Sequence, residues 1–269
     1  MYVIGSPDFK RNGRRQPQIL LPDGSDRVSY RSPSSVAKSL GDSGGLTYWK
    51  QAMTALGVGS SRALQYKFSH IADCGGYDGS AKGDLYQAVK KAFVAGGGEE
   101  AAEIGTVVHS YTDLIDQGLA CDPPRELRPW FDCYKRAIEN LTLIGGEVRL
   151  VQDDLQVAGT ADRFWQLPDG EVRCADTKTG SDPKYPDGVC LQVAMYSHSL
   201  EYDALTDERF RLHKDLNPDR GLMIHLPVRE SGEPHCDIYE LPLDRGWDRS
   251  KLAYRAFTTE IKKVEKVSF

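Results

Sequence analysis

The chain has 269 residues, a hydrophobic fraction of 40% and a formal net charge of −5. This length allows one large domain, or a core with a sizeable extension, and the composition excludes a disordered chain. The net charge argues against a protein that coats nucleic acid non-specifically. It does not argue against an enzyme that acts on nucleic acid, because the useful electrostatic field is local.

Targeting segments and disulfides are not indicated either. The apolar runs are far shorter than a membrane span, and the N-terminal stretch MYVIGSPDFKRNGRRQ lacks the apolar core of a signal peptide. The six cysteines are scattered without CxxC spacing, at positions 74, 121, 133, 174, 190 and 236. Reduced thiols in a cytoplasm are therefore expected, and the cysteines suggest neither zinc nor an iron–sulfur cluster.

Residues 1–30 are rich in Pro, Gly and Arg and show no periodicity, which is typical of a solvated terminal arm. The alternative is a basic patch that meets phosphates, formed by Lys10, Arg11, Arg14 and Arg15. Ser32 is a predicted N-cap, with Pro33 at the first helical position. The pattern then predicts helices over 46–56, 62–73 and 83–94, separated by Gly-rich breaks.

A stronger helix is predicted over 99–118, with an apolar stripe at helical spacing and Gly118 as its stop. His109 shares a face of this helix with Gly105 and Asp113. A Gly inside a helix costs roughly 1 kcal/mol relative to Ala, which close approach of a backbone or a metal site would justify. A histidine alone is more often hydrogen-bonded than a ligand. Asp113 is either a residue that supports a metal ligand from outside or a solvent-facing residue, and the second alternative is favoured.

The second half of the chain alternates between strand and helix patterns. A helix is expected over 126–143, and another over 189–202. Strands are expected over 147–151, 157–166, 172–178, 221–228 and 236–241, and a final amphipathic helix over 243–264. This order predicts an α/β core behind an all-helical N-terminal part.

The predicted hairpin around Pro168-Asp169-Gly170 contains the candidate catalytic residues. If these three residues form the loop, Asp162 lies opposite Asp176, and Lys178 shares a face with Asp176. Two close carboxylates repel each other, and a divalent cation between them removes that penalty, since hard cations prefer oxygen ligands. The alternative is a surface ion-pair cluster, which is common and contributes little to stability.

Four short motifs occur in order: GTVVH on a helix, GTAD in a strand, ADTK in the next strand and QVAMY in a helix. Together they resemble the RecB-like nucleases of the PD-(D/E)XK superfamily over residues 99–245. Each motif alone is weak, whereas their order and context are more specific. The SPSSVAKSLGDSGG and TYWK stretches look like the segment that precedes the core in phage exonucleases related to the CRISPR adaptation nuclease family.

The resemblance implies a restriction-endonuclease-like core: a helix, a three-stranded antiparallel meander, a second helix and further strands in a mixed sheet. It places this core and the C-terminal helix in residues 99–269, with an arm and helical extension in residues 1–98. It also implies a Mg²⁺ or Mn²⁺ ion held by His109, Asp162, Asp176 and the carbonyl of Thr177. Lys178 would be the catalytic lysine, and Gln192 and Tyr196 would flank the site.

The implied activity is a DNA exonuclease in phage recombination, replication or repair, acting on linear single- or double-stranded ends in the cytoplasm of a bacterial host. A phage recombination or replication protein would be its partner. The spacing leaves open a site- or structure-specific endonuclease and a DNA-binding relic without activity. Some relatives hold an iron–sulfur cluster through closely spaced C-terminal cysteines. Cys236 stands alone in that region, so no cluster is expected.

Overall fold

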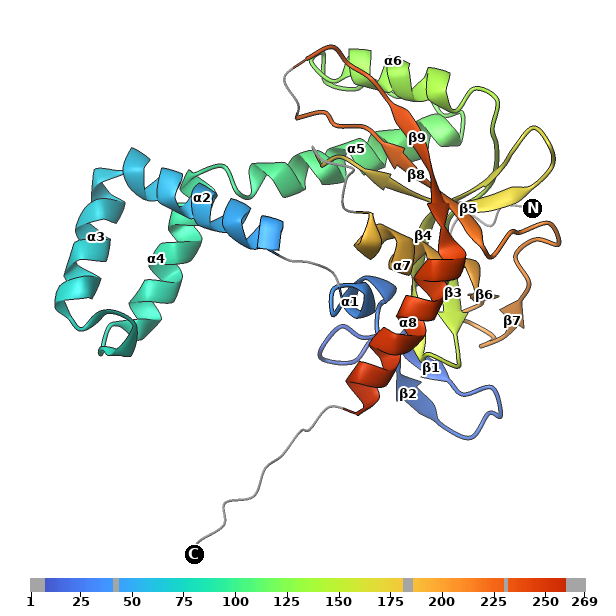
Figure 1. The fold of residues 1–269 in the computed structure, drawn as a ribbon, viewed down its shortest axis with the longest axis horizontal. Helices are drawn as coiled ribbons and strands as arrows, with labels where there is room; N and C mark the ends of the chain where they lie inside the picture. Colours follow the sequence, from blue (N-terminus) through green and yellow to red (C-terminus); the bar gives the residue numbers. More distant parts are fainter. Residues whose placement is uncertain (1–7, 41–43, 181–185, 230–231, 260–269) are drawn as a thin grey trace, which may run out of the picture. The chain divides into compact units, whose positions relative to one another are not determined.

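The computed structural model describes residues 8–40, 44–180, 186–229 and 232–259 (Figure 1). It divides into two compact units, which we name the helical unit (residues 42–111) and the sheet unit (residues 1–41 and 112–269). Helix α5 (Glu100–Asp116) continues through the boundary between them. This division differs from the predicted boundary after residue 98, because residues 8–40 pack with the sheet.

The sheet unit contains a mixed seven-stranded sheet in the order β7-β6-β3-β4-β5-β8-β9. Strands β3, β4 and β5 form an antiparallel meander, and β5 pairs with β8 in parallel. The strands are β3 Thr142–Gln152, β4 Val157–Gln166, β5 Val172–Lys178, β6 Leu200–Tyr202, β7 Arg209–Phe210, β8 Arg220–His225 and β9 Asp237–Pro242. The α/β class, the meander and the mixed sheet are thus as predicted.

A group of three helices packs on one face of this sheet and buries its apolar side chains. Phe164 of the sheet packs with Val193 of α7 (Asp187–Ser197). Val36 of α1 (Pro33–Ala37) and Ala253 of α8 (Leu243–Thr258) pack with Met195 on another part of α7. Because α7 lies between the sheet and these two helices, every residue from Cys190 to Ser197 except Gln192 is buried, and the sequence there is apolar nearly all round.

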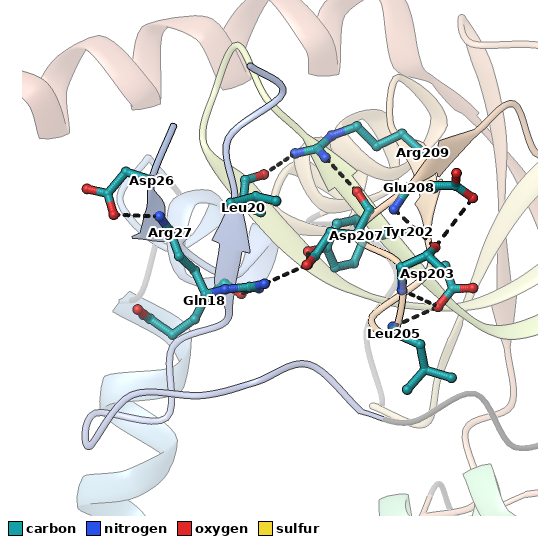
Figure 2. Close-up of polar contacts among 11 residues, drawn as sticks. Gln18, Leu20, Asp26, Arg27, Tyr202, Asp203, Leu205, Asp207, Glu208 and Arg209 are labelled. Atoms are coloured by element: carbon teal, nitrogen blue, oxygen red, sulfur yellow. Dashed lines mark hydrogen bonds and ion pairs between the residues drawn. The ribbon is translucent and has the colours of Figure 1, made fainter. Parts of the chain in front are cut away.

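The N-terminal residues are part of the core, so the prediction of a solvated arm was wrong for residues 8–31. Strands β1 (Gln18–Leu20) and β2 (Arg27–Ser29) form a hairpin, and Ile19 is fully buried beside Tyr202. Arginines fix the hairpin to the β6–β7 turn (Figure 2). Arg27 donates to Asp207 at 2.6 Å, and Arg209 donates to the Leu20 carbonyl at 2.7 Å. Such long-range contacts leave no periodic pattern in the sequence.

The helical unit contains α2 (Gly44–Ser60), α3 (Arg62–Asp73), α4 (Lys82–Ala95) and most of α5. Helices α2 and α4 touch backbone to backbone at two glycines. A Cβ at Gly57 would lie 1.8 Å from the Ala92 carbonyl oxygen, and one at Gly96 would lie 1.8 Å from that of Met53. Any side chain at these positions would push the two helices apart.

Two predicted helices end earlier than expected. Helix α6 covers only Arg128–Ala137. Strand β3 begins at Thr142 and contains Gly145 and Gly146, the two glycines that were expected to end the helix. Gly145 lies at a bulge in the β3–β4 ladder, where the register shifts. Helix α7 ends at Ser197, and the chain continues into β6. Helix α8 ends at Thr258, and the predicted extension to residue 264 lies outside the described residues.

Within the described ranges, no helix combines the length and the apolar character that crossing a bilayer requires. All six cysteines are free thiols.

Candidate active site

The β4–β5 hairpin brings the two predicted carboxylates together. Its turn closes with a bond from the Gly170 amide to the Leu167 carbonyl at 2.9 Å, and Gly170 has a φ of 92°. Only glycine adopts this conformation without strain. The ladder pairs Gln166 with Val172 and Arg163 with Ala175. Continuing this register by one residue places Asp162 opposite Asp176, as the sequence predicted.

Asp162, Asp176 and the nearby Glu147 form a group that we name the acidic cluster. Asp176 is its most buried carboxylate, with 3% of the residue's surface exposed. The Lys178 ammonium lies 2.5 Å from its Oδ2, since residues two apart on a strand share a face. Gln192 of α7 donates from Nε2 to Oδ1 at 3.1 Å. A buried, ionised carboxylate requires such partners. Helix α7 therefore holds Asp176 in position, and Lys178 lies beside it.

Asp162 has a different environment. It is half-buried, and its Oδ2 accepts the Thr177 backbone amide at 3.3 Å. Thr177, which lies between Asp176 and Lys178 in the sequence, is fully buried. The backbone at Thr177 thus links the two acidic residues, while whether its carbonyl binds an ion stays a prediction.

Tyr196 is 6% exposed and lies one turn after Gln192 on α7. Burial, and then the negative charge of Asp162, raise the pKa of the Tyr196 hydroxyl. The ring lies against Gly159: a Cβ there would meet the Tyr196 hydroxyl at 2.8 Å and Pro33 at 3.0 Å. The glycine of the GTAD motif is therefore required by the close approach of this tyrosine.

Glu147 is a third acidic residue beside Asp162 and Asp176, and no sequence motif predicted it. The pairs Gly146–Arg163 and Val148–Ala161 place it opposite Asp162 on β3, and its φ of 51° is in the left-handed region. Burial, and then the charges of Asp113 and Asp162, raise its pKa to about 7. Its only sequence signal was its position in the strand beside the GTAD strand.

Arg163 points to the opposite face of β4 from Asp162 and is 1% exposed. Its guanidinium donates to Asp116, to Thr112 at 2.7 Å and to Asp113 at 2.5 Å. The favoured prediction that Asp113 only faces solvent was therefore wrong. Asp113 is one of two carboxylates that neutralise the buried guanidinium of Arg163. Tyr134 of α6 also donates to Asp116, at 2.7 Å.

His109 is half-buried on α5. It falls in the helical unit, on the other side of the division from Asp162 and Asp176. Its assignment as a metal ligand stays a prediction.

A basic cavity of about 350 Å³ adjoins the acidic cluster through Tyr196 and Gly159, which line it. Four arginines line it as well: Arg11, Arg14, Arg15 and Arg31. The loop that carries three of them is held by Asn12, whose Oδ1 accepts the amides of Arg14 at 2.9 Å and Gln16 at 3.0 Å. A folded loop thus concentrates positive charge in a protein that is acidic overall.

The donor atoms of the acidic cluster suit a hard divalent cation. Asp162, Asp176 and Glu147 offer carboxylate oxygens, the ligands that Mg²⁺ and Mn²⁺ prefer. Burial first, and then the charges of Asp113 and Asp162, raise the pKa of Glu147, and a bound cation would favour its ionised form. These residues could hold such an ion, and Lys178 adds a positive charge at the same place.

A scan of the chain against models of protein families finds no match, and a search of curated protein sequences finds none either.

Proposed function

We propose that the chain is a divalent-metal-dependent deoxyribonuclease that hydrolyses phosphodiester bonds, with exonuclease action favoured. The observation that carries the proposal is the Asp162–Asp176–Lys178 cluster. Its acidic residues are opposite each other on a hairpin, Gln192 fixes one of them and a lysine contacts it. The meander and α7 would then correspond to the restriction-endonuclease-like core of the PD-(D/E)XK, RecB-like nucleases that the sequence motifs resemble.

The named residues have distinct tasks in this mechanism. Asp162 and Asp176 would hold Mg²⁺ or Mn²⁺, with Glu147 and the Thr177 carbonyl as further donors. A bound divalent cation supplies charge neutralisation at the phosphoryl oxygen and a water of lowered pKa. Lys178 places an ammonium where negative charge develops in the transition state. Gln192 would hold the Asp176 carboxylate in its orientation through their hydrogen bond. Tyr196 would lie between the acidic cluster and the basic cavity that it lines.

The basic cavity supports a nucleic-acid substrate. A strand whose scissile phosphate lies at the carboxylates needs positive charge for its neighbouring phosphates, and Arg14 and Arg15 line a cavity that Tyr196 shares. The N-terminal loop would then bind the DNA backbone, which is the alternative to a solvated arm that the sequence had left open. A role in phage DNA recombination, replication or repair, with a phage protein as partner, follows from the resemblance alone.

The decisive experiment is digestion of end-labelled linear DNA beside a closed circular control, with Mg²⁺ and with Mn²⁺. Loss of nucleotides from linear ends with the circle intact supports an exonuclease. Cuts in the circle at discrete positions indicate an endonuclease on the same core. DNA that is bound but uncut with either ion would contradict nuclease activity and leave a DNA-binding protein.

Matched variants connect the activity to the cluster. Asp176→Asn should abolish it, whereas Asp169→Asn, at the tip of the same hairpin, should retain it. Lys178→Met should lower the rate by about 10²–10³-fold, the usual effect of removing one group that stabilises transition-state charge. Lys214→Met, at a side chain that is 83% exposed, is its control. Equal rates for Lys178→Met and Lys214→Met would remove Lys178 from the mechanism.

A further inference from the structure

A second group of potential ligands lies at one end of the β8–β9 hairpin. His225 is the last residue of β8 and pairs with Asp237, the first residue of β9. Opposite residues of an antiparallel pair share a face, so their side chains meet. His235 precedes Asp237 by two residues. Each of the three side chains offers one ligand atom, and these atoms lie within 4.8 Å of one another.

His225 is buried, with 3% of its surface exposed. Its Nε2 lies 2.6 Å from the Gly180 carbonyl oxygen. A carbonyl can only accept, so a neutral His225 carries its proton on Nε2 and has a lone pair on Nδ1. Nδ1 is buried and has no hydrogen-bond partner among the described residues. A buried polar atom of this kind is unfavourable unless something binds it.

His235 repeats this arrangement with the other ring nitrogen. Its Nδ1 lies 3.1 Å from the Glu233 carbonyl oxygen, so the neutral ring carries its proton there. The lone pair on Nε2 then faces Asp237 Oδ2 at 4.0 Å. The Trp130 ring lies against this imidazole, with the ring centroids 5.8 Å apart, and limits its orientation.

Each imidazole thus donates one N–H to a backbone carbonyl, which leaves Nδ1 of His225 and Nε2 of His235 as the nitrogens able to bind a ligand. Metal-binding histidines usually have this outer hydrogen bond, which fixes the tautomer. One ligand atom of each side chain lies in this group, and the described residues give the buried His225 Nδ1 no hydrogen-bond partner, so a cation bound here would satisfy it. We propose that His225, His235 and Asp237 bind a zinc-class divalent ion, with water as a fourth ligand.

The donor types decide the class of ion. Two imidazole nitrogens and one carboxylate suit Zn²⁺ and related transition metals, whereas Mg²⁺ and Ca²⁺ prefer sites made of oxygen. The site differs from the acidic cluster in its residues, but it lies beside it in the sheet, because His225 pairs with Lys178 across β5 and β8. A bound ion would join β8, β9 and the chain at Gly180, and so would fix the end of β5 that carries Lys178.

Zinc titration of the full chain tests the proposal. Purified protein, freed of metal, would compete with a chromophoric chelator for Zn²⁺, and we expect one tight equivalent per chain. His235→Ala and Asp237→Asn change residues outside the buried core. Each should weaken Zn²⁺ binding by at least about 100-fold, since even outer-shell changes cost 10–100-fold. His225→Ala should do the same if the variant folds.

Two controls separate this site from others. His213→Ala removes a histidine that lies 3.9 Å from Asp215 elsewhere in the sheet unit, and it should bind Zn²⁺ like the wild type. Asp176→Asn should also retain the ion, whatever happens to nuclease activity. Binding of Co²⁺ in place of Zn²⁺ should give a visible absorption that His235→Ala abolishes.

Two results would overturn the proposal. One is a wild-type chain that takes no Zn²⁺ from the chelator. The other is tight Zn²⁺ binding that persists in both His235→Ala and Asp237→Asn.

Discussion

The sheet unit and the helical unit bury different kinds of side chain. Among the described residues, every buried polar or charged one belongs to the sheet unit: Thr112, Arg163, Arg173, Asp176, Thr177, Ser197, Ser199, His225 and Ser250. Helices α2, α3 and α4 bury Gly57, Ile71, Ala88 and Ala92, whereas Leu56 and Tyr66 are 60% and 76% exposed. The sheet unit therefore adds hydrogen-bonded and ion-paired side chains to a large apolar core, whereas α2 and α4 of the helical unit meet backbone to backbone.

The largest effect is expected for the buried arginine of the sheet unit. Arg163→Met leaves Asp116, whose side chain is 2% exposed, without its guanidinium. Breaking a buried pair from one side costs about 3–5 kcal/mol in the free energy of unfolding. Arg128→Met removes an ion pair whose side chains are 54% and 87% exposed, and should cost less than about 1 kcal/mol. Urea denaturation compares the two, and similar losses would show that burial does not set the difference.

The next effect concerns activity. Gln192→Ala removes the amide that holds Asp176, and a lost outer hydrogen bond of this kind lowers metal affinity or activity by about 10–100-fold. Gln65→Ala removes a glutamine of the helical unit that donates to the Gly59 carbonyl at 3.0 Å, and should leave the nuclease rate unchanged. The readout is the rate on linear DNA against Mn²⁺ concentration. If excess Mn²⁺ does not restore part of the Gln192→Ala rate, Gln192 acts on something other than the ion.

Two glycines of the same helix test the contact in the helical unit. Gly57→Ala sets a Cβ against the Ala92 carbonyl, whereas a Cβ at Gly59 meets nothing within 4 Å. Overpacking costs about 1–3 kcal/mol, and the better helix propensity of Ala returns up to about 1 kcal/mol. Gly57→Ala should therefore destabilise the unit, and Gly59→Ala should stabilise it slightly. Hydrogen exchange in residues 42–111 measures both, and the same sign for both variants would contradict a close α2–α4 contact.

The smallest effect is a pH dependence in the sheet unit. The pKa of Glu147 is raised from 4.5 to about 7, so its protonated form favours folding. That contribution is fully present below pH 4.5 and is lost as the pH rises through about 7. Glu147→Gln stays neutral, so its stability relative to wild type should rise over this range. Glu147 lies within the protein's surface layer but keeps more than a third of its surface in contact with solvent, whose screening keeps the change small.

Denaturation in metal-free buffer across this pH range gives the measurement, with Glu139→Gln as the exposed control. Adding Mg²⁺ should remove the dependence, because a cation favours the ionised carboxylates. A wild-type profile that Mg²⁺ leaves unchanged would place Glu147 outside any metal site.

Local patterns predicted the centre of the sheet unit well. Strands β4 and β5 have the predicted bounds because a strong turn, Pro168-Asp169-Gly170, fixes their register. Strands β1, β2, β6 and β7 were missed, since they are two or three residues long and depend on contacts such as that between Arg27 and Asp207. Glu147 was missed because its neighbours come from other elements. The pairing of two histidines with Asp237 likewise needs a hairpin register that spacing alone does not give.

The order of the seven strands has a consequence for self-association. The edges of the sheet are β7, with two residues, and β9, which carries Asp237 and Glu240 and ends at Pro242. A short edge, charged side chains and a proline all hinder the addition of a strand from another molecule. Neither of these two border strands is therefore a good template for growth into fibres.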